Sequence, residues 1–159
     1  MTNVEQTRMK ILAKQFGDMK KNHNMIAFFP DKMNPFNWHI SFKGPVDSDF
    51  QGGIYHCQLK LTNYPDKPPE IKIMNESGAY HVNQALCIHG LSANNPQDWT
   101  PGTQISTIVE ALSMYMNLRT DRGGLGFIKV LNQEAIKKHR DASIKFKCSC
   151  GADHSTLFK

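Results

Sequence analysis

Two stretches in which apolar and polar residues strictly alternate constrain the fold of this chain more than any other feature. Their apolar members are Trp38, Ile40 and Phe42 in the first stretch and Tyr55, Cys57, Leu59 and Leu61 in the second. A period of two places successive side chains on opposite faces of a β-strand. We therefore predict two strands, each with one buried face, and we assign Cys57 to the core.

Shorter apolar segments on either side extend this sheet. Residues 25–29 precede the first alternating stretch and residues 71–74 follow the second. The connections between these segments carry Gly and Pro residues that are typical of turns. The sequence therefore predicts a four-stranded antiparallel meander.

Helical periodicity appears before and after the predicted sheet. Apolar residues spaced three and four apart predict an amphipathic helix over about 3–20, where Thr2 and Glu5 have the spacing of a capping box. A second, core-facing helix is expected to begin near Thr100 and Pro101, and a third, basic helix covers about 132–146. Strands followed by helices indicate an α+β domain.

A long irregular segment over 75–101 separates the last predicted strand from the second helix, and it contains Cys87. Loops of this length inside a compact domain are usually functional. A cysteine in such a loop is expected to be partly exposed, as a nucleophilic thiolate requires. The alternative is a small buried apolar residue, which is the common role of an unpaired cysteine.

Length and composition describe one folded domain. The chain has 159 residues, of which 40% are hydrophobic, and its four cysteines are too widely spread for a disulfide framework. It shows neither a signal peptide nor a stretch of about 18 apolar residues, so we expect a soluble intracellular protein with reduced thiols. We divide it into a domain over 1–147 and a tail over 148–159. The connection over 119–126 is expected to be flexible.

The net charge of +5 is concentrated between Lys129 and Lys147, where six Lys or Arg residues face only Glu134 and Asp141. A nucleic-acid interface would interleave such residues with exposed aromatic side chains, and this helix offers only Phe146. A solvated helix face or an acidic protein partner explains the pattern better. We expect no nucleic-acid binding.

Three segments in this order resemble the ubiquitin-conjugating enzyme family: FQGGIYHCQLKLTNYPDKPPEIKI, the loop around Cys87, and DWTPGTQISTIVEAL. The resemblance covers roughly 5–145. Within the family, FNWHISFKGPVDSDFQGGIYH and the GGLG of 123–126 are similar to the J-type subfamily, which is usually anchored to the endoplasmic reticulum by a C-terminal helix. The segment from Cys148 to Gly151 is also similar to a cysteine-rich stretch found there.

The resemblance implies an enzyme that receives ubiquitin from the activating enzyme as a thioester on Cys87. Transfer to a lysine or hydroxyl of a protein substrate would follow, with no cofactor and no metal. Ser77 stands where the J-type pattern has a catalytic asparagine, and Asn75 or Asn83 are candidates to compensate for the lost amide. His89 is a candidate base or pKa-lowering neighbour, with a solvated loop histidine as the alternative.

Asp121 falls where the family keeps a residue that orients the incoming amine, with a surface turn residue as the alternative. The resemblance also implies two ligase-binding loops, formed by Pro65, Asp66 and Lys67 and by Trp99, Thr100 and Pro101. Asp66 replaces the usual apolar anchor, which should weaken an apolar ligase pocket. Ser77 and Asp66 together favour the second hypothesis, a catalytically weak conjugating fold that serves as a binding or structural subunit.

Two further expectations concern the cellular location of the protein and possible zinc ligands near its C-terminus. No membrane helix is visible, so we expect a cytoplasmic protein that reaches the cytosolic face of the endoplasmic reticulum through partners. Either the chain stops before such a helix or the protein lacks it. Cys148, Cys150 and His154 are three candidate zinc ligands, and a disordered tail without metal is the preferred interpretation.

Overall fold

The computed structural model describes residues 2–119, 122 and 124–159. The elements are α1 (Asn3–Met19), β1 (Met25–Phe28), β2 (Asn37–Lys43), β3 (Ile54–Lys60), β4 (Glu70–Ile73), α2 (Ile105–Met116), α3 (Gln133–Ser143) and a 3₁₀ helix, η1 (His154–Thr156). The strands form one antiparallel sheet in the order β1-β2-β3-β4. The predicted α+β order and the four-stranded meander are confirmed.

Hydrogen bonds mark where the first two helices begin, local ones at α1 and a tertiary one at α2. The predicted capping box at α1 is present: the Thr2 hydroxyl accepts from the Glu5 amide, and the Glu5 carboxylate accepts from the Thr2 amide. Helix α2 begins at Ile105, later than predicted. Residues 100–103 instead form a turn, and the Ile105 amide donates to the Gln15 side chain from α1 at 2.8 Å. A tertiary contact thus sets this helix start.

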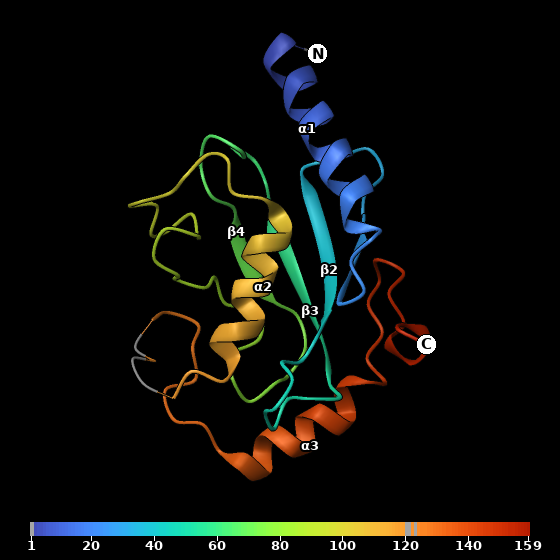
Figure 1. Cartoon of the computed structure of the whole chain (residues 1–159), viewed down its shortest axis with the longest axis vertical. Coiled ribbons are helices and arrows are strands. Elements are labelled where there is room, and N and C mark those ends of the chain that lie inside the picture. Colours follow the sequence, from blue (N-terminus) through green and yellow to red (C-terminus); the bar gives the residue numbers. More distant parts are fainter. Residues whose placement is uncertain (1, 120–121, 123) are drawn as a thin grey trace.

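One face of the sheet forms the hydrophobic core beneath α2, which lies across the strands in Figure 1. Helix α2 buries Ile105, Ile108, Val109, Leu112 and Met116. Cys57 is fully buried among these side chains, as predicted. Burial raises the pKa of the Cys57 thiol to about 12, so this cysteine stays protonated.

The opposite face of β2 and β3 is also buried, which the alternation did not predict. His39, Ser41 and His56 point away from the core, yet each has a relative exposure of 5% or less. The C-terminal segment crosses this face, and His154 lies 2.9 Å from the Ser41 hydroxyl. The prediction of a single buried face was therefore wrong for these strands, because a remote segment covers the second face.

Residues 147–153 form a small hairpin with defined contacts. Lys147 and Asp153 form an antiparallel bridge, and the Cys148 amide donates to the Ala152 carbonyl at 2.9 Å. Ala152 and His154 are buried. The division into a domain over 1–147 and a tail stays a prediction, although the structure packs this part of the tail onto the sheet. Within the described residues, each helix is too short or too polar to cross a membrane.

In the connection over 119–126, Arg122 is anchored by hydrogen bonds to the domain, and the flexibility of the connection stays a prediction. Arg122 is buried, and its guanidinium donates to the carbonyls of Tyr115 and Leu118 at the end of α2 and to that of Ala79. A guanidinium at a helix C-terminus satisfies carbonyls that have no partner within the helix. Burial lowers the pKa of Arg122.

Candidate active site

Cys87 is half-buried in the irregular segment between β4 and α2. Its amide donates to the Leu125 carbonyl at 2.9 Å, and the preceding residue, Leu86, bonds back to Ile71 in β4. The cysteine is therefore fixed on one side by the sheet and on the other by the loop after α2. Its side chain is left partly open to solvent.

Two glycines let the loop after α2 approach Cys87 this closely. A Cβ at Gly124 would lie 2.8 Å from the Cys87 carbonyl oxygen, closer than real Cβ contacts occur. Gly126 has a φ of +86° and a Cβ there would lie 2.5 Å from Leu86. Glycine at 124 is thus explained by close backbone approach, and glycine at 126 by close approach together with a left-handed conformation.

A compact turn after Cys87 brings an amide side chain to the sulfur. The Gly90 amide donates to the Asn95 carbonyl at 2.9 Å, and the Ser92 hydroxyl accepts from the Ile88 amide at 2.8 Å. As a result, the Asn95 Nδ2 lies 3.5 Å from the Cys87 sulfur. Among the described residues, this is the side-chain donor that contacts the thiol.

Sequence reasoning missed Asn95, because no spacing marks an asparagine after the cysteine as its neighbour. The signal that was present is the turn chemistry of Gly90 and of the Asn95-Pro96 pair, which indicates that the chain folds back here. The direction of that turn follows only from the tertiary structure, in which Ala93 bonds to Pro69 next to β4.

The residues that the sequence suggested for the role of the catalytic asparagine do not contact Cys87 in the described hydrogen bonds. The Ser77 hydroxyl is buried and accepts from the amides of Ala79 and Tyr80, so it shapes the local turn. Asn75 is buried just after β4, where it accepts from the His56 amide and donates to the Ile54 carbonyl of β3.

Asn83 is exposed in a left-handed turn with a φ of 63°. The catalytic role of Ser77 stays a prediction, and its observed contacts are those of a structural hydroxyl.

His89 and Asp121 are the remaining predicted catalytic residues. His89 is exposed, and its Nε2 lies 2.7 Å from an Asp98 carboxylate oxygen, so its described partner is this carboxylate. Asp121 lies outside the described residues.

The two predicted ligase-binding loops lie side by side. The Trp99 indole donates to the Pro65 carbonyl at 2.9 Å, and its ring packs edge-on against Tyr64. A surface groove of about 540 Å³ separates the exposed parts of the loops. It is lined by Asn63, Asp66, Lys67, Pro68, Ala93, Pro96, Trp99 and Pro101. Thr100 lies at the exposed turn before α2.

A second group of thiols lies on the outer face of the sheet, where Cys148 and Cys150 meet His39 and His56. Burial, together with the neighbouring rings of His39 and His154, lowers the pKa of His56 to about 3. Burial also lowers the pKa of His39 and raises that of Cys150 to about 11. Without a cation, the two imidazoles and the Cys150 thiol are therefore neutral near pH 7.

The sequence matches the profile of the ubiquitin-conjugating enzyme family over residues 11–147. The chain therefore belongs to the ubiquitin-conjugating enzyme family, which confirms the family predicted from the sequence. The match includes the sheet, Cys87, the two adjacent loops and all of α2 and α3.

Curated relatives include ubiquitin-conjugating enzyme E2 J1 of Homo sapiens and of Mus musculus. Each is 31% identical over 155 residues, which cover 94% of this chain and 47% of the relative. Ubiquitin-conjugating enzyme E2 6 of Schizosaccharomyces pombe is 34% identical over 67% of this chain and 48% of its own length. The chain thus spans about half the length of these relatives.

Solved structures agree on the fold. Human ubiquitin-conjugating enzyme E2 G1 superposes with a TM-score of 0.58 at 24% identity, covering 68% of this chain and 93% of that one. A structure described as a novel ubiquitin-conjugating enzyme has a TM-score of 0.56 at 25% identity, covering 67% of this chain and 72% of that one.

Proposed function

We propose that this protein is an active ubiquitin-conjugating enzyme that carries ubiquitin as a thioester on Cys87. The observation that carries the proposal is the environment of this thiol within the family-matched region. Cys87 is half-buried, its amide is hydrogen-bonded to the Leu125 carbonyl, and an amide donor stands 3.5 Å from its sulfur. An accessible thiol with a polar neighbour meets the requirement for a nucleophile, whereas the buried Cys57 does not.

Two acyl transfers follow from this assignment. The Cys87 thiolate attacks the thioester carbonyl of ubiquitin on the activating enzyme, and the thiolate of that enzyme leaves. The amine or hydroxyl of a substrate then attacks the new thioester, releases the Cys87 thiolate and loses its proton to solvent or to a nearby base. Each step places negative charge on the carbonyl oxygen, and the two-donor amide of Asn95 is the candidate to stabilise it.

The partners in this proposal are ubiquitin, its activating enzyme, protein substrates and a RING-type ligase. The groove between Asp66 and Trp99 supports the ligase assignment, because its proline-rich walls are held by the Trp99–Pro65 hydrogen bond. Rigid loops lose little entropy on docking. The J-type resemblance supports a cytoplasmic protein that reaches the cytosolic face of the endoplasmic reticulum through partners.

The second hypothesis is a binding or structural subunit without efficient transfer. It is favoured by Ser77, since this hydroxyl is engaged with two backbone amides in place of the family's asparagine. Removal of one oxyanion donor lowers acyl-transfer rates by about 10²–10³. The two hypotheses differ in whether Asn95 restores this function.

Incubation with activating enzyme, ATP and ubiquitin, followed by a non-reducing gel and intact-mass measurement, tests the proposal. We expect a reductant-sensitive adduct of one ubiquitin in the wild type and none in Cys87→Ala. Cys87→Ser should give a reductant-resistant ester. A folded wild type that forms no adduct beside an active control enzyme would contradict the enzymatic proposal under these conditions and favour the binding-subunit hypothesis.

A further inference from the structure

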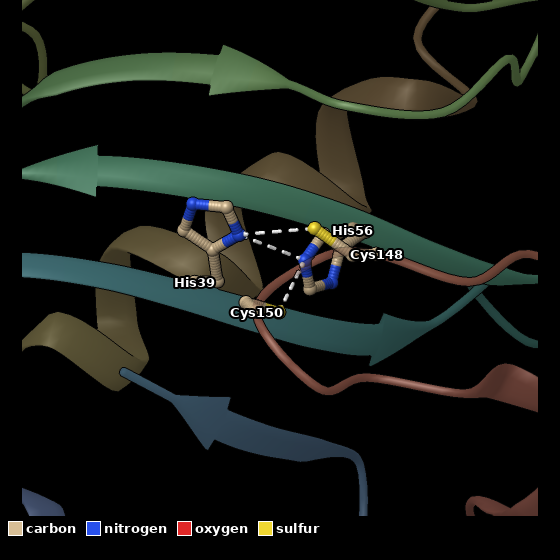
Figure 2. Close-up of side chains that lie close together, drawn as sticks. All are labelled: His39, His56, Cys148 and Cys150. Atoms are coloured by element: carbon tan, nitrogen blue, oxygen red, sulfur yellow. Dashed lines mark hydrogen bonds between the residues drawn. The ribbon is translucent and has the colours of Figure 1, made fainter. Parts of the chain in front are cut away.

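Four metal-ligand side chains from three distant parts of the sequence converge on the outer face of the sheet (Figure 2). His39 lies on β2, His56 on β3, and Cys148 and Cys150 on the C-terminal hairpin. Their ligand atoms all lie within 4.8 Å of one another. The His rings are buried and the two thiols are half-buried, so the four side chains are largely shielded from solvent.

Three of the six spacings between these ligand atoms are close to those of a tetrahedral zinc site, and the others lie within 4.8 Å. With Zn–S of about 2.3 Å and Zn–N of about 2.0–2.1 Å, a regular tetrahedron separates two nitrogens by about 3.3 Å and nitrogen from sulfur by about 3.5 Å. Here His39 Nδ1 and His56 Nε2 are 3.0 Å apart. Cys148 Sγ lies 3.5 Å from His39, and Cys150 Sγ lies 3.4 Å from His56.

A chain of hydrogen bonds behind His56 sets the tautomer that a metal requires. His154 Nδ1 lies 2.8 Å from the Ser143 carbonyl, so it must donate there, and Nε2 of the neutral ring is then an acceptor. The Ser41 hydroxyl donates to that Nε2 at 2.9 Å. The Ser41 oxygen therefore accepts from His56 Nδ1 at 2.8 Å. This leaves the lone pair of His56 Nε2 directed at the thiols, as in metal-bound histidines whose other nitrogen is hydrogen-bonded.

Within residues 147–153, the C-terminal hairpin buries no large apolar side chain, and Phe146 just before it packs against His56 of β3 with ring centroids 5.5 Å apart. Across its residues 147–153, the buried apolar side chain is Ala152. Burial of one methyl group contributes only about 1 kcal/mol, and small structures of this kind usually depend on a metal or a disulfide. The turn from Cys148 to Gly151 points both thiols at the histidines, with Gly151 in the left-handed region.

We propose that His39, His56, Cys148 and Cys150 bind one structural Zn²⁺ that fastens the C-terminal hairpin to β2 and β3. Both thiols lose a proton to solvent as the metal binds, and the two thiolates balance its charge. Four protein ligands fill the tetrahedral coordination sphere, so the site is structural and separate from Cys87. His154, a ligand candidate at the sequence level, instead orients His56 through Ser41.

Zinc content of the purified chain tests this directly. We expect about one zinc per wild-type chain by elemental analysis after dialysis without added metal, and less than about 0.1 in the Cys148→Ser/Cys150→Ser double variant. Ser149→Ala, between the two ligands, and Cys87→Ser, the distant thiol, are the matched controls and should retain zinc. With cobalt in place of zinc, the wild type should show the absorption of tetrahedral thiolate ligation. The Cys148→Ser/Cys150→Ser double variant should not.

A protection experiment on the wild type does not depend on whether a variant folds. Alkylation followed by peptide mass analysis should find Cys148 and Cys150 protected by zinc and exposed by a chelator, with Cys87 reactive in both states. The proposal is overturned if the reduced wild type binds neither zinc nor cobalt, if the double variant keeps the metal, or if a Cys148–Cys150 disulfide is found instead. These outcomes are independent of ubiquitin transfer on Cys87.

Discussion

Cys87 and the pair of Cys148 and Cys150 all lie in irregular segments, but different numbers of side chains face their sulfur atoms. Among the described residues, one side chain, the amide of Asn95, contacts the Cys87 sulfur, and the residue is half-buried. Cys148 and Cys150 face two buried imidazoles. A thiol with one polar neighbour can still accept an acyl group, whereas thiols enclosed with two imidazoles have the geometry to share a metal. The ligand set around the sulfur, rather than loop structure as such, separates the two roles.

The largest expected effect is the loss of ubiquitin transfer when Cys87 is replaced, compared with its retention when Cys148 and Cys150 are replaced. Cys87→Ala should lower ubiquitin transfer by at least ~10³-fold, because it removes the proposed nucleophile. The Cys148→Ser/Cys150→Ser variant should keep thioester formation within about twofold at a temperature where it is folded. Rates of adduct formation, measured beside circular dichroism spectra, check both. Equal loss in the two variants would show that the sites do not act separately.

Asn95 should have the next largest effect. Asn95→Ala removes the amide beside the sulfur and should slow discharge of the thioester to a free amine by about 10²-fold. Ser77→Ala is the matched control: it removes a turn hydroxyl and should cost about 1 kcal/mol of stability with little change in rate. Single-turnover discharge and thermal melts distinguish these outcomes. A larger rate loss for Ser77→Ala would assign the catalytic role to Ser77 instead.

Removal of zinc should act on stability rather than on the first acyl transfer. A ligand present at about 100 times its dissociation constant stabilises the folded state by about 2.7 kcal/mol, which for this chain length corresponds to a Tm loss of about 5–10 °C on chelation. The double cysteine variant should melt at the lower temperature with or without chelator. If chelation leaves the wild-type Tm unchanged, the hairpin is held by other contacts.

The smallest expected effect concerns His89. Its described partner is the exposed Asp98 carboxylate, and exposed ion pairs contribute little. His89→Ala and Asp98→Ala should each change thioester formation by less than about twofold. Transfer rates across a pH series check this. A tenfold loss of thioester formation in His89→Ala but not in Asp98→Ala would show that this histidine helps to activate Cys87. Cys87 would then also depend on a histidine, as Cys148 and Cys150 do.

The contrast also shows which parts of the molecule could be predicted. Alternation in β2 and β3 correctly identified the core face, because strand periodicity is local. The same pattern gave the wrong environment for His39 and His56, since polar alternation cannot reveal that residues about a hundred positions later will cover them. The start of α2 was likewise displaced by a contact from Gln15 in α1.

The sequence by itself determined the α+β order, the meander, the buried state of Cys57 and the family, since these depend on periodicity and on motif order. Only the tertiary structure placed Asn95 beside Cys87 and brought the C-terminal thiols to the strand histidines. Both pairings join side chains whose spacing in the sequence has no period. They arise from how turns and the hairpin pack against the finished sheet, which is a property of three-dimensional packing and not of local pattern.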